Sequence, residues 1–181
     1  MRRLKSWANL RANLNGGNKF MGKPFVAILM GSDSDLPMVE AGFAVLEKFA
    51  IRYEVKVTSA HRTPEATAEF VRDADARGCA VFICAAGMAA HLAGAVAAMT
   101  LKPVIGIPID ASLNGLDSLL STVQMPAGIP VATVAIGKAG AKNAAYLAAQ
   151  IMAVGDSALS KKVVDERAEA ARAVIAKDSA L

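Results

Sequence analysis

Val57-Thr58-Ser59-Ala60-His61-Arg62-Thr63-Pro64 is the stretch from which the fold of this chain is best worked out. It follows residues 52–57, an apolar run long enough for one strand. Thr63 and Pro64 are typical of the N-cap and the first position of a helix. The stretch therefore predicts a strand-to-helix turn. In open α/β sheets such turns, at the carboxyl ends of the strands, are where ligands bind.

The residue types in this turn suit proton transfer and anion binding. Histidine is the side-chain type whose unperturbed charge change lies closest to neutral pH, so His61 is a candidate to shuttle a proton. Arg62 and the free amides at a helix start can hold an anion. An exposed loop in front of a capped helix is the plainer alternative, and the turn alone does not decide between the two.

The rest of the chain predicts a parallel sheet covered by helices. Apolar runs suitable for further buried strands lie at 25–30, 80–84, 103–108 and 131–136. Helical patterns separate them, and the apolar residues are mainly Ala, Val, Ile and Leu, with only 5% aromatic residues. Five strands alternating with helices indicate an α/β fold with a five-stranded parallel sheet. At 181 residues the length fits one domain, which we expect to span residues 21–181.

Two more strand ends carry chemically useful residues. Residues 31–35, Gly-Ser-Asp-Ser-Asp, follow the first strand, and their hydroxyls and amides suit phosphate while Asp35 suits ribose hydroxyls. Ser and Asp also cap helices, which is the commoner role, and the missing glycines exclude a dinucleotide fingerprint. Residues 85–92 follow the third strand and contain His91, which alone would more often be a core histidine. Because parallel strands end at the same edge, the recurrence of small or polar residues after three strands predicts one composite site.

Composition limits the partners. The net charge is +4, but five basic residues and no acidic ones precede Met21, and the remainder holds 15 basic against 16 acidic residues. No basic stripe is left for a nucleic acid. Cys79 and Cys84 lie in an apolar run, where free thiols behave as small hydrophobic side chains. We therefore expect free cysteines and a reducing cytoplasm. Residues 79–101 carry no formal charge, yet they are rich in Ala and Gly, so we expect no membrane helix.

The two ends of the chain differ from the core. Residues 1–20 form a basic extension that contains Trp7; a targeting segment, an expression remnant and a translated upstream region all fit, and we favour the last, with Met21 as the working start. Residues 156–176 predict an amphipathic helix. Its apolar stripe has no evident place on a sheet already covered on both faces, so we expect an oligomer contact. The stripe comprises Leu159, Val163, Ala171, Val174 and Ile175.

The chain resembles the class I enzymes of the PurE family, the N5-carboxyaminoimidazole ribonucleotide mutases of purine biosynthesis. The resemblance covers about residues 25–155 and implies a flavodoxin-like α/β/α sandwich, a homo-octamer with sites shared between subunits, and a cytoplasmic enzyme that needs no metal, nucleoside triphosphate or biotin. The matching segments, in family order, are Gly31–Asp35, Ser59–Pro64, Ala89–Leu92, Gly115–Ser121, Val123–Pro126, Gly128–Val131, Ala135–Gly140 and Asn143–Ala145.

The resemblance also implies the roles of individual residues. His61 is expected to protonate the departing nitrogen and then to take the ring C4 proton. Ser32, Ser59 and Arg62 are expected to bind the 5′-phosphate, and Asp35 the ribose. The other expected substrate-binding residues, which surround the base and released carbon dioxide, are Ala60, Gly87, Ala89, Ala90, His91 and Leu92.

Two alternatives stay open. A class II enzyme carboxylates aminoimidazole ribonucleotide with free carbon dioxide, but Arg62 after the histidine and the run Ala89–Leu92 resemble class I. A flavin- or nucleotide-binding module without chemistry would share the architecture. The chain also departs from the usual family loop, because Ala85 and Met88 replace glycines and Ala93 replaces a proline.

Overall fold

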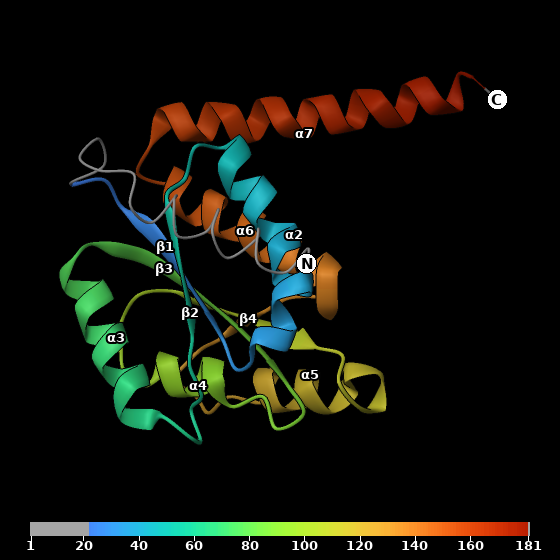
Figure 1. The fold of residues 1–181 in the computed structure, drawn as a ribbon. Coiled ribbons are helices and arrows are strands. Elements are labelled where there is room, and N and C mark those ends of the chain that lie inside the picture. The colour runs from blue at the N-terminus through green and yellow to red at the C-terminus, as the bar shows by residue number, and fades with distance from the viewer. Residues whose placement is uncertain (1–21, 181) are drawn as a thin grey trace, which may run out of the picture.

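The chain folds around a five-stranded parallel sheet, as predicted. The computed structural model describes residues 22–180, and the strand order is β2-β1-β3-β4-β5. All four strand pairs are parallel, so the strands end at the same edge (Figure 1). The strands are β1 (Phe25–Met30), β2 (Tyr53–Val57), β3 (Cys79–Gly87), β4 (Val104–Ile109) and β5 (Ala132–Thr133).

Helices cover both faces of the sheet and create two cores. The first lies between the sheet and α2 (Leu36–Lys48) and α6 (Gly137–Ala153); the second lies under α3 (Pro64–Ala76) and α4 (Leu92–Ala97). Strand β1 shows the division, because alternate side chains of a strand point to opposite faces. Val26, Ile28 and Met30 enter the first core, whereas Phe25, Ala27 and Leu29 enter the second.

The remaining elements complete the layers. Short 3₁₀ turns at Asp33–Asp35 and Leu113–Gly115 lead into α2 and into α5 (Leu116–Val123). Helix α5 lies beside α4, and α7 (Ser157–Asp178) runs across the outside of α6 and extends beyond the body of the domain (Figure 1). None of the helices within residues 22–180 is long and apolar enough to cross a membrane, and residues 79–101 instead contain β3 and α4.

The predicted fifth strand, residues 131–136, is much shorter than expected. Only Ala132 and Thr133 pair with β4. Beyond them the backbone turns toward α6, and a Cβ on Gly140 would lie 1.6 Å from the Ala135 carbonyl oxygen. Val134 still donates to the Gly106 carbonyl of β4 at 3.0 Å, whereas Ala135 lies against the first turn of α6, which an apolar sequence pattern alone does not reveal.

Helix α6 is covered on several sides, as its composition of small apolar residues predicts. It packs against α2, β4 and α7. The contact with α2 is especially close, because a Cβ on Gly42 would lie 2.6 Å from the Ala141 carbonyl oxygen. Small residues at this crossing let the two backbones approach, so any larger side chain at position 42 would push the helices apart.

The expectation that the whole stripe of α7 lacks a place in its own subunit is wrong for its first half. Asp156 caps the helix by accepting hydrogen bonds from the amides of Ala158 and Leu159, both 3.0 Å long. Leu159 is buried in the first core. Only the distal half is unpartnered within the described chain, where Val174 and Ile175 are 66% and 65% exposed.

Ionic contacts fix the first half of α7 to the domain. Lys48 of α2 forms an ion pair with Glu166, and the Tyr146 hydroxyl of α6 donates to Glu166 Oε1 at 3.0 Å. The Lys48 ammonium and the Tyr146 hydroxyl lower the pKa of the Glu166 carboxyl. Glu166 therefore joins three helices at one point.

The two cysteines are buried, free thiols. Burial raises the pKa of the Cys79 thiol to about 11 and also raises that of Cys84. Because the thiolate is the reactive form, neither cysteine is suited to be a nucleophile.

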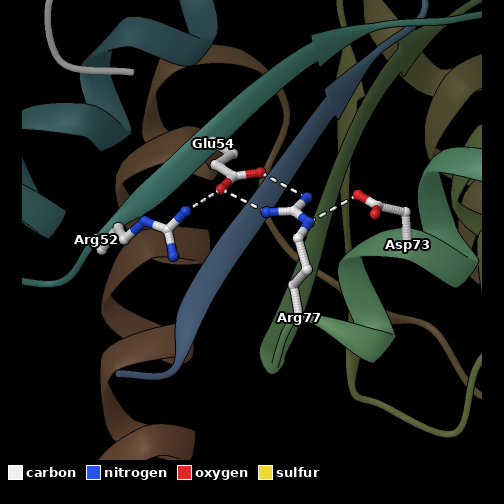
Figure 2. A network of polar contacts seen from close by, with 4 residues as sticks. All are labelled: Arg52, Glu54, Asp73 and Arg77. Atoms are coloured by element: carbon white, nitrogen blue, oxygen red, sulfur yellow. Dashed lines mark hydrogen bonds and ion pairs between the residues drawn. The ribbon is translucent and has the colours of Figure 1, made fainter. Parts of the chain in front are cut away.

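A polar network joins the amino ends of β1 and β2 (Figure 2). It lies at the edge of the sheet opposite residues 31–35, 58–63 and 88–91. Glu54 on β2 accepts from both terminal nitrogens of Arg77, each at 2.8 Å, and also pairs with Arg52. Arg77 in turn donates to Asp73 at 2.7 Å. The two guanidinium groups lie over the Phe25 ring, 4.7 and 5.1 Å from its centre. The network thus connects β1, β2 and the end of α3.

Glu54→Gln is expected to destabilise the fold by about 1–3 kcal/mol, because two guanidinium groups would lose the charge that both of them contact. The thermal midpoint should fall by several degrees, measured by circular dichroism. Asp73→Asn is the matched control, since that carboxylate is 58% exposed and its loss should change the midpoint little. An unchanged midpoint for Glu54→Gln would show that the network adds no stability.

Candidate active site

Three loops meet where β1, β2 and β3 end. They are residues 31–35, 58–63 and 88–91, and their strands are neighbours in the sheet. Two contacts join the loops directly. Arg62 Nη2 donates to the Gly31 carbonyl at 3.4 Å, and His61 Nε2 lies 2.8 Å from His91 Nδ1. The sheet topology therefore places the two histidines and the arginine in one location.

The histidine pair is the chemical centre of this location. The rings lie edge to face, with centroids 4.9 Å apart and an interplanar angle of 89°. A hydrogen bond between two imidazoles requires that one facing nitrogen carries a proton and the other does not. Both side chains are exposed, so a ligand can reach them. The geometry is suited to the exchange of a proton between the two rings.

Hydroxyl groups fix the turn that carries His61. Thr58 and Thr67 are buried and their hydroxyls lie 2.7 Å apart, which ties the end of β2 to α3. Thr63 is the N-cap residue of α3, as predicted, but its side chain makes no capping hydrogen bond. Its hydroxyl accepts from the Ser59 amide at 2.9 Å and donates to the Ser59 carbonyl at 3.1 Å. Thr63 occupies the N-cap position, but its side chain closes the turn instead.

Ser59 and Arg62 are held together within that turn. The Arg62 amide donates to Ser59 Oγ at 3.1 Å. Arg62 is exposed, and Ala60 packs partly against the second core. Because the Gly31 contact of Arg62 is long, its guanidinium has donor capacity for a ligand.

Residues 32–35 form a compact polar group beside Arg62. The Ser32 hydroxyl oxygen accepts from the Ser34 amide at 3.3 Å and from the Ser34 hydroxyl at 2.8 Å. Asp35 is only 8% exposed, and this burial raises the pKa of its carboxyl. Ser34, whose hydroxyl was predicted together with that of Ser32 to suit phosphate, donates instead to Asp35 at 3.4 Å and so connects Ser32 with Asp35. The spacing of Ser32 and Ser34, two residues apart, is the sequence feature from which this bridge could have been predicted.

Only some of the residues predicted to bind substrate in and beside the loop after β3 are exposed. Ala90 and Leu92 are buried, at 1% and 3% exposure, whereas Ala89 and His91 are exposed. Gly87 has no room for a side chain, because a Cβ there would lie 2.9 Å from the Ala111 Cβ. The structure thus brings His91 to the meeting point, while Ala90 and Leu92 support the loop from the core side.

Comparison with known proteins identifies the family of the chain. The family model described as AIR carboxylase matches residues 25–173. The N5-carboxyaminoimidazole ribonucleotide mutase of Pyrococcus abyssi is 54% identical over 153 residues, which are 84% of this chain and 87% of that protein. The mutase of Bacillus subtilis is 49% identical over 158 residues, or 87% and 97% of the two chains.

The fold comparison gives the same result. The crystal structure of Treponema denticola PurE has a TM-score of 0.79 at 32% identity, and the match covers 88% of this chain and 99% of that one. Family model, sequence relatives and solved structure all cover most of the chain. The chain therefore belongs to the AIR carboxylase (PurE) family.

Proposed function

We propose that this protein converts N5-carboxyaminoimidazole ribonucleotide to 4-carboxy-5-aminoimidazole ribonucleotide, in purine biosynthesis. The observation that carries the proposal is the identity of about half of all aligned residues with proteins named as this mutase, over nearly their full length. The histidine pair and the neighbouring arginine support it, because the reaction needs two proton transfers on an anionic substrate.

In the proposed reaction the bond between N5 and its carboxylate carbon breaks and carbon dioxide leaves. The bonding electrons stay on nitrogen, which takes a proton from His61. The ring carbon C4 then attacks the retained carbon dioxide, and His61 recovers a proton from C4. One histidine can perform both transfers, since its ordinary pKa lies near working pH. The 2.8 Å contact with His91 would hold the ring of His61 in place between the two steps.

The substrate-binding roles follow the three loops. Arg62 with Ser32 and Ser59 would bind the 5′-phosphate, because charged hydrogen bonds to phosphate are strong. Buried Asp35 would accept from the ribose hydroxyls. The loop from Gly87 to Leu92 would surround the base, with Ala60 beside it. Neither metal nor cofactor takes part in these steps.

A direct assay tests the proposal. The purified protein should convert synthetic N5-carboxyaminoimidazole ribonucleotide to the C4 isomer, measured by coupling to the next ligase or by chromatography. Failure to convert it, together with a bound yellow cofactor in the absorbance spectrum, would support a flavin-binding module instead. Efficient carboxylation of aminoimidazole ribonucleotide with bicarbonate would support the class II reaction.

We also infer a homo-octamer in which the distal half of α7 contacts another subunit. Val174 and Ile175 on this half are exposed. Apolar surface of this kind favours association.

Two free, buried thiols fit a reducing cytoplasm.

The double variant Val174→Asp with Ile175→Asp is expected to lower the assembled mass measured by light scattering. Both side chains are exposed in the single chain, so the fold should survive, as circular dichroism would show. Ala173→Asp adds a charge to a different face of the same helix turn and is the matched control. If the double variant keeps the assembly state of the unaltered protein, the distal half of α7 is not a subunit contact.

A further inference from the structure

Two buried hydroxyl groups lie next to the turn that carries His61 and Arg62. Thr67 of α3 is 0% exposed, and Thr58, which follows β2, is 5% exposed. Their side-chain oxygens lie 2.7 Å apart. Threonine is found mostly at protein surfaces, and a buried hydroxyl costs free energy unless it is hydrogen-bonded. The hydrogen bonds that these two hydroxyls make therefore decide what the pair does.

The direction of each hydrogen bond follows from the distances, because a hydroxyl has only one proton to donate. The Thr67 hydroxyl donates to the Thr63 carbonyl at 3.0 Å, and the Thr63 hydroxyl donates to the Ser59 carbonyl at 3.1 Å. Two acceptors remain for Thr58, the Thr67 hydroxyl oxygen at 2.7 Å and the Thr63 hydroxyl oxygen at 3.2 Å. The Thr58 hydroxyl donates to Thr67, since only the shorter distance is that of a normal bond between hydroxyls.

This direction leaves the Thr63 side chain free to close the turn. Its hydroxyl oxygen accepts from the Ser59 amide at 2.9 Å, while the Thr63 amide donates to the Ser59 carbonyl at 2.9 Å. His61 lies between these two residues in the sequence, and its Nε2 is 2.8 Å from His91 Nδ1. A change in the closure of the turn therefore moves His61 relative to His91.

We propose that Thr67 is a positioning residue for His61; the effect on turnover rests on the proposed function. The Thr67 hydroxyl accepts the Thr58 proton and so keeps that proton away from Thr63. Without the Thr67 hydroxyl, Thr58 is a buried donor that has lost its acceptor, which is costly, so it turns to Thr63. A normal bond there requires the 3.2 Å separation to shorten by about 0.4 Å, which draws the Thr63 oxygen away from the Ser59 amide.

The test compares a single variant with a double variant. Thr67→Val replaces the hydroxyl by a methyl group of similar size, and it should lower kcat by about five- to tenfold, since a displacement of about 1 Å can cost about a hundredfold. Thr58→Val combined with Thr67→Val should recover most of the lost turnover, because no buried donor is then left without an acceptor. Thr67→Ser keeps the hydroxyl and should resemble the unaltered protein.

A second measurement needs no substrate. The chain contains two histidines, which are His61 and His91. Nuclear magnetic resonance of the free protein with isotope-labelled histidine therefore observes only the rings of this pair. Thr67→Val should shift the ring resonances, and the double variant should return them close to their original positions.

Thr122→Val is the matched control. Thr122 is 2% exposed, and its hydroxyl donates to the Ser118 carbonyl, four residues earlier, as the Thr67 hydroxyl donates to that of Thr63. It lies in α5, outside the turn, so its loss should change neither kcat nor the ring resonances.

Equal losses of turnover in Thr67→Val and in the double variant would show a packing role and overturn the proposal. Unchanged kcat or unchanged ring resonances in Thr67→Val would overturn it as well. If the resonances change and recover as expected while the unaltered protein converts no substrate, the proposed function fails and the positioning of His61 by Thr67 stands.

Discussion

His61→Asn is expected to lower turnover by about 10²–10⁴-fold while ligand binding survives. Asparagine is similar in size and can form hydrogen bonds, but it cannot carry a proton between N5 and C4. The turn itself is fixed by Thr58, Thr63 and Thr67, so the loss of the imidazole should not unfold it. Steady-state kinetics and calorimetry with the product would measure the two quantities separately.

His91→Asn is the informative companion to that variant. It removes the group 2.8 Å from His61 without removing the proposed proton carrier, so turnover should fall less than in His61→Asn. If His61→Asn kept its turnover at saturating substrate, His61 would be a binding residue and the proton would have to come from elsewhere.

Arg62→Ala should mainly weaken binding, by about 1.5–3 kcal/mol, the range for a hydrogen bond to a charged group. This corresponds to an increase in KM of about 10- to 150-fold, with turnover at saturation much less affected. Arg62 is exposed and its contact with Gly31 is long, so its removal should cost the free protein little stability. Kinetics across a substrate series would separate the effect on KM from that on kcat.

Arg62→Lys serves as the control for charge. Lysine keeps the positive charge but loses the planar pair of donors, so partial recovery of affinity is expected. If Arg62→Ala instead lowered turnover at saturation as strongly as His61→Asn, Arg62 would act in the chemical step and the proposed division of roles would be wrong.

The meeting of the three loops could be predicted from the sequence, because parallel strands end at one edge whatever the details of each loop. The strands 25–30 and 103–108 were predicted to within one residue at each end, since continuous apolar runs bounded by polar residues or Pro are unambiguous. Family membership and the mutase relatives agree with the resemblance found in the motifs.

Other features depend on packing that a sequence pattern does not contain. The hydroxyl of Thr63 turns back to Ser59 because that amide competes for it, and only the turn geometry decides the outcome. The stripe of α7 is continuous in sequence, yet Leu159 is buried in the first core while Val174 is exposed. The network around Glu54 joins residues far apart in sequence and gave no local signal. Residues 1–20, expected to precede a working start at Met21, lie outside the described residues.

The fate of the carboxylate carbon is the most direct test of the proposed mutase. Substrate labelled with carbon-13 in the N5-carboxylate should give product with the label at C4, even in a large excess of unlabelled bicarbonate, because the carbon dioxide never leaves the site. Complete dilution of the label, together with efficient use of aminoimidazole ribonucleotide and bicarbonate, would contradict the mutase reaction and show that the enzyme takes carbon dioxide from solution.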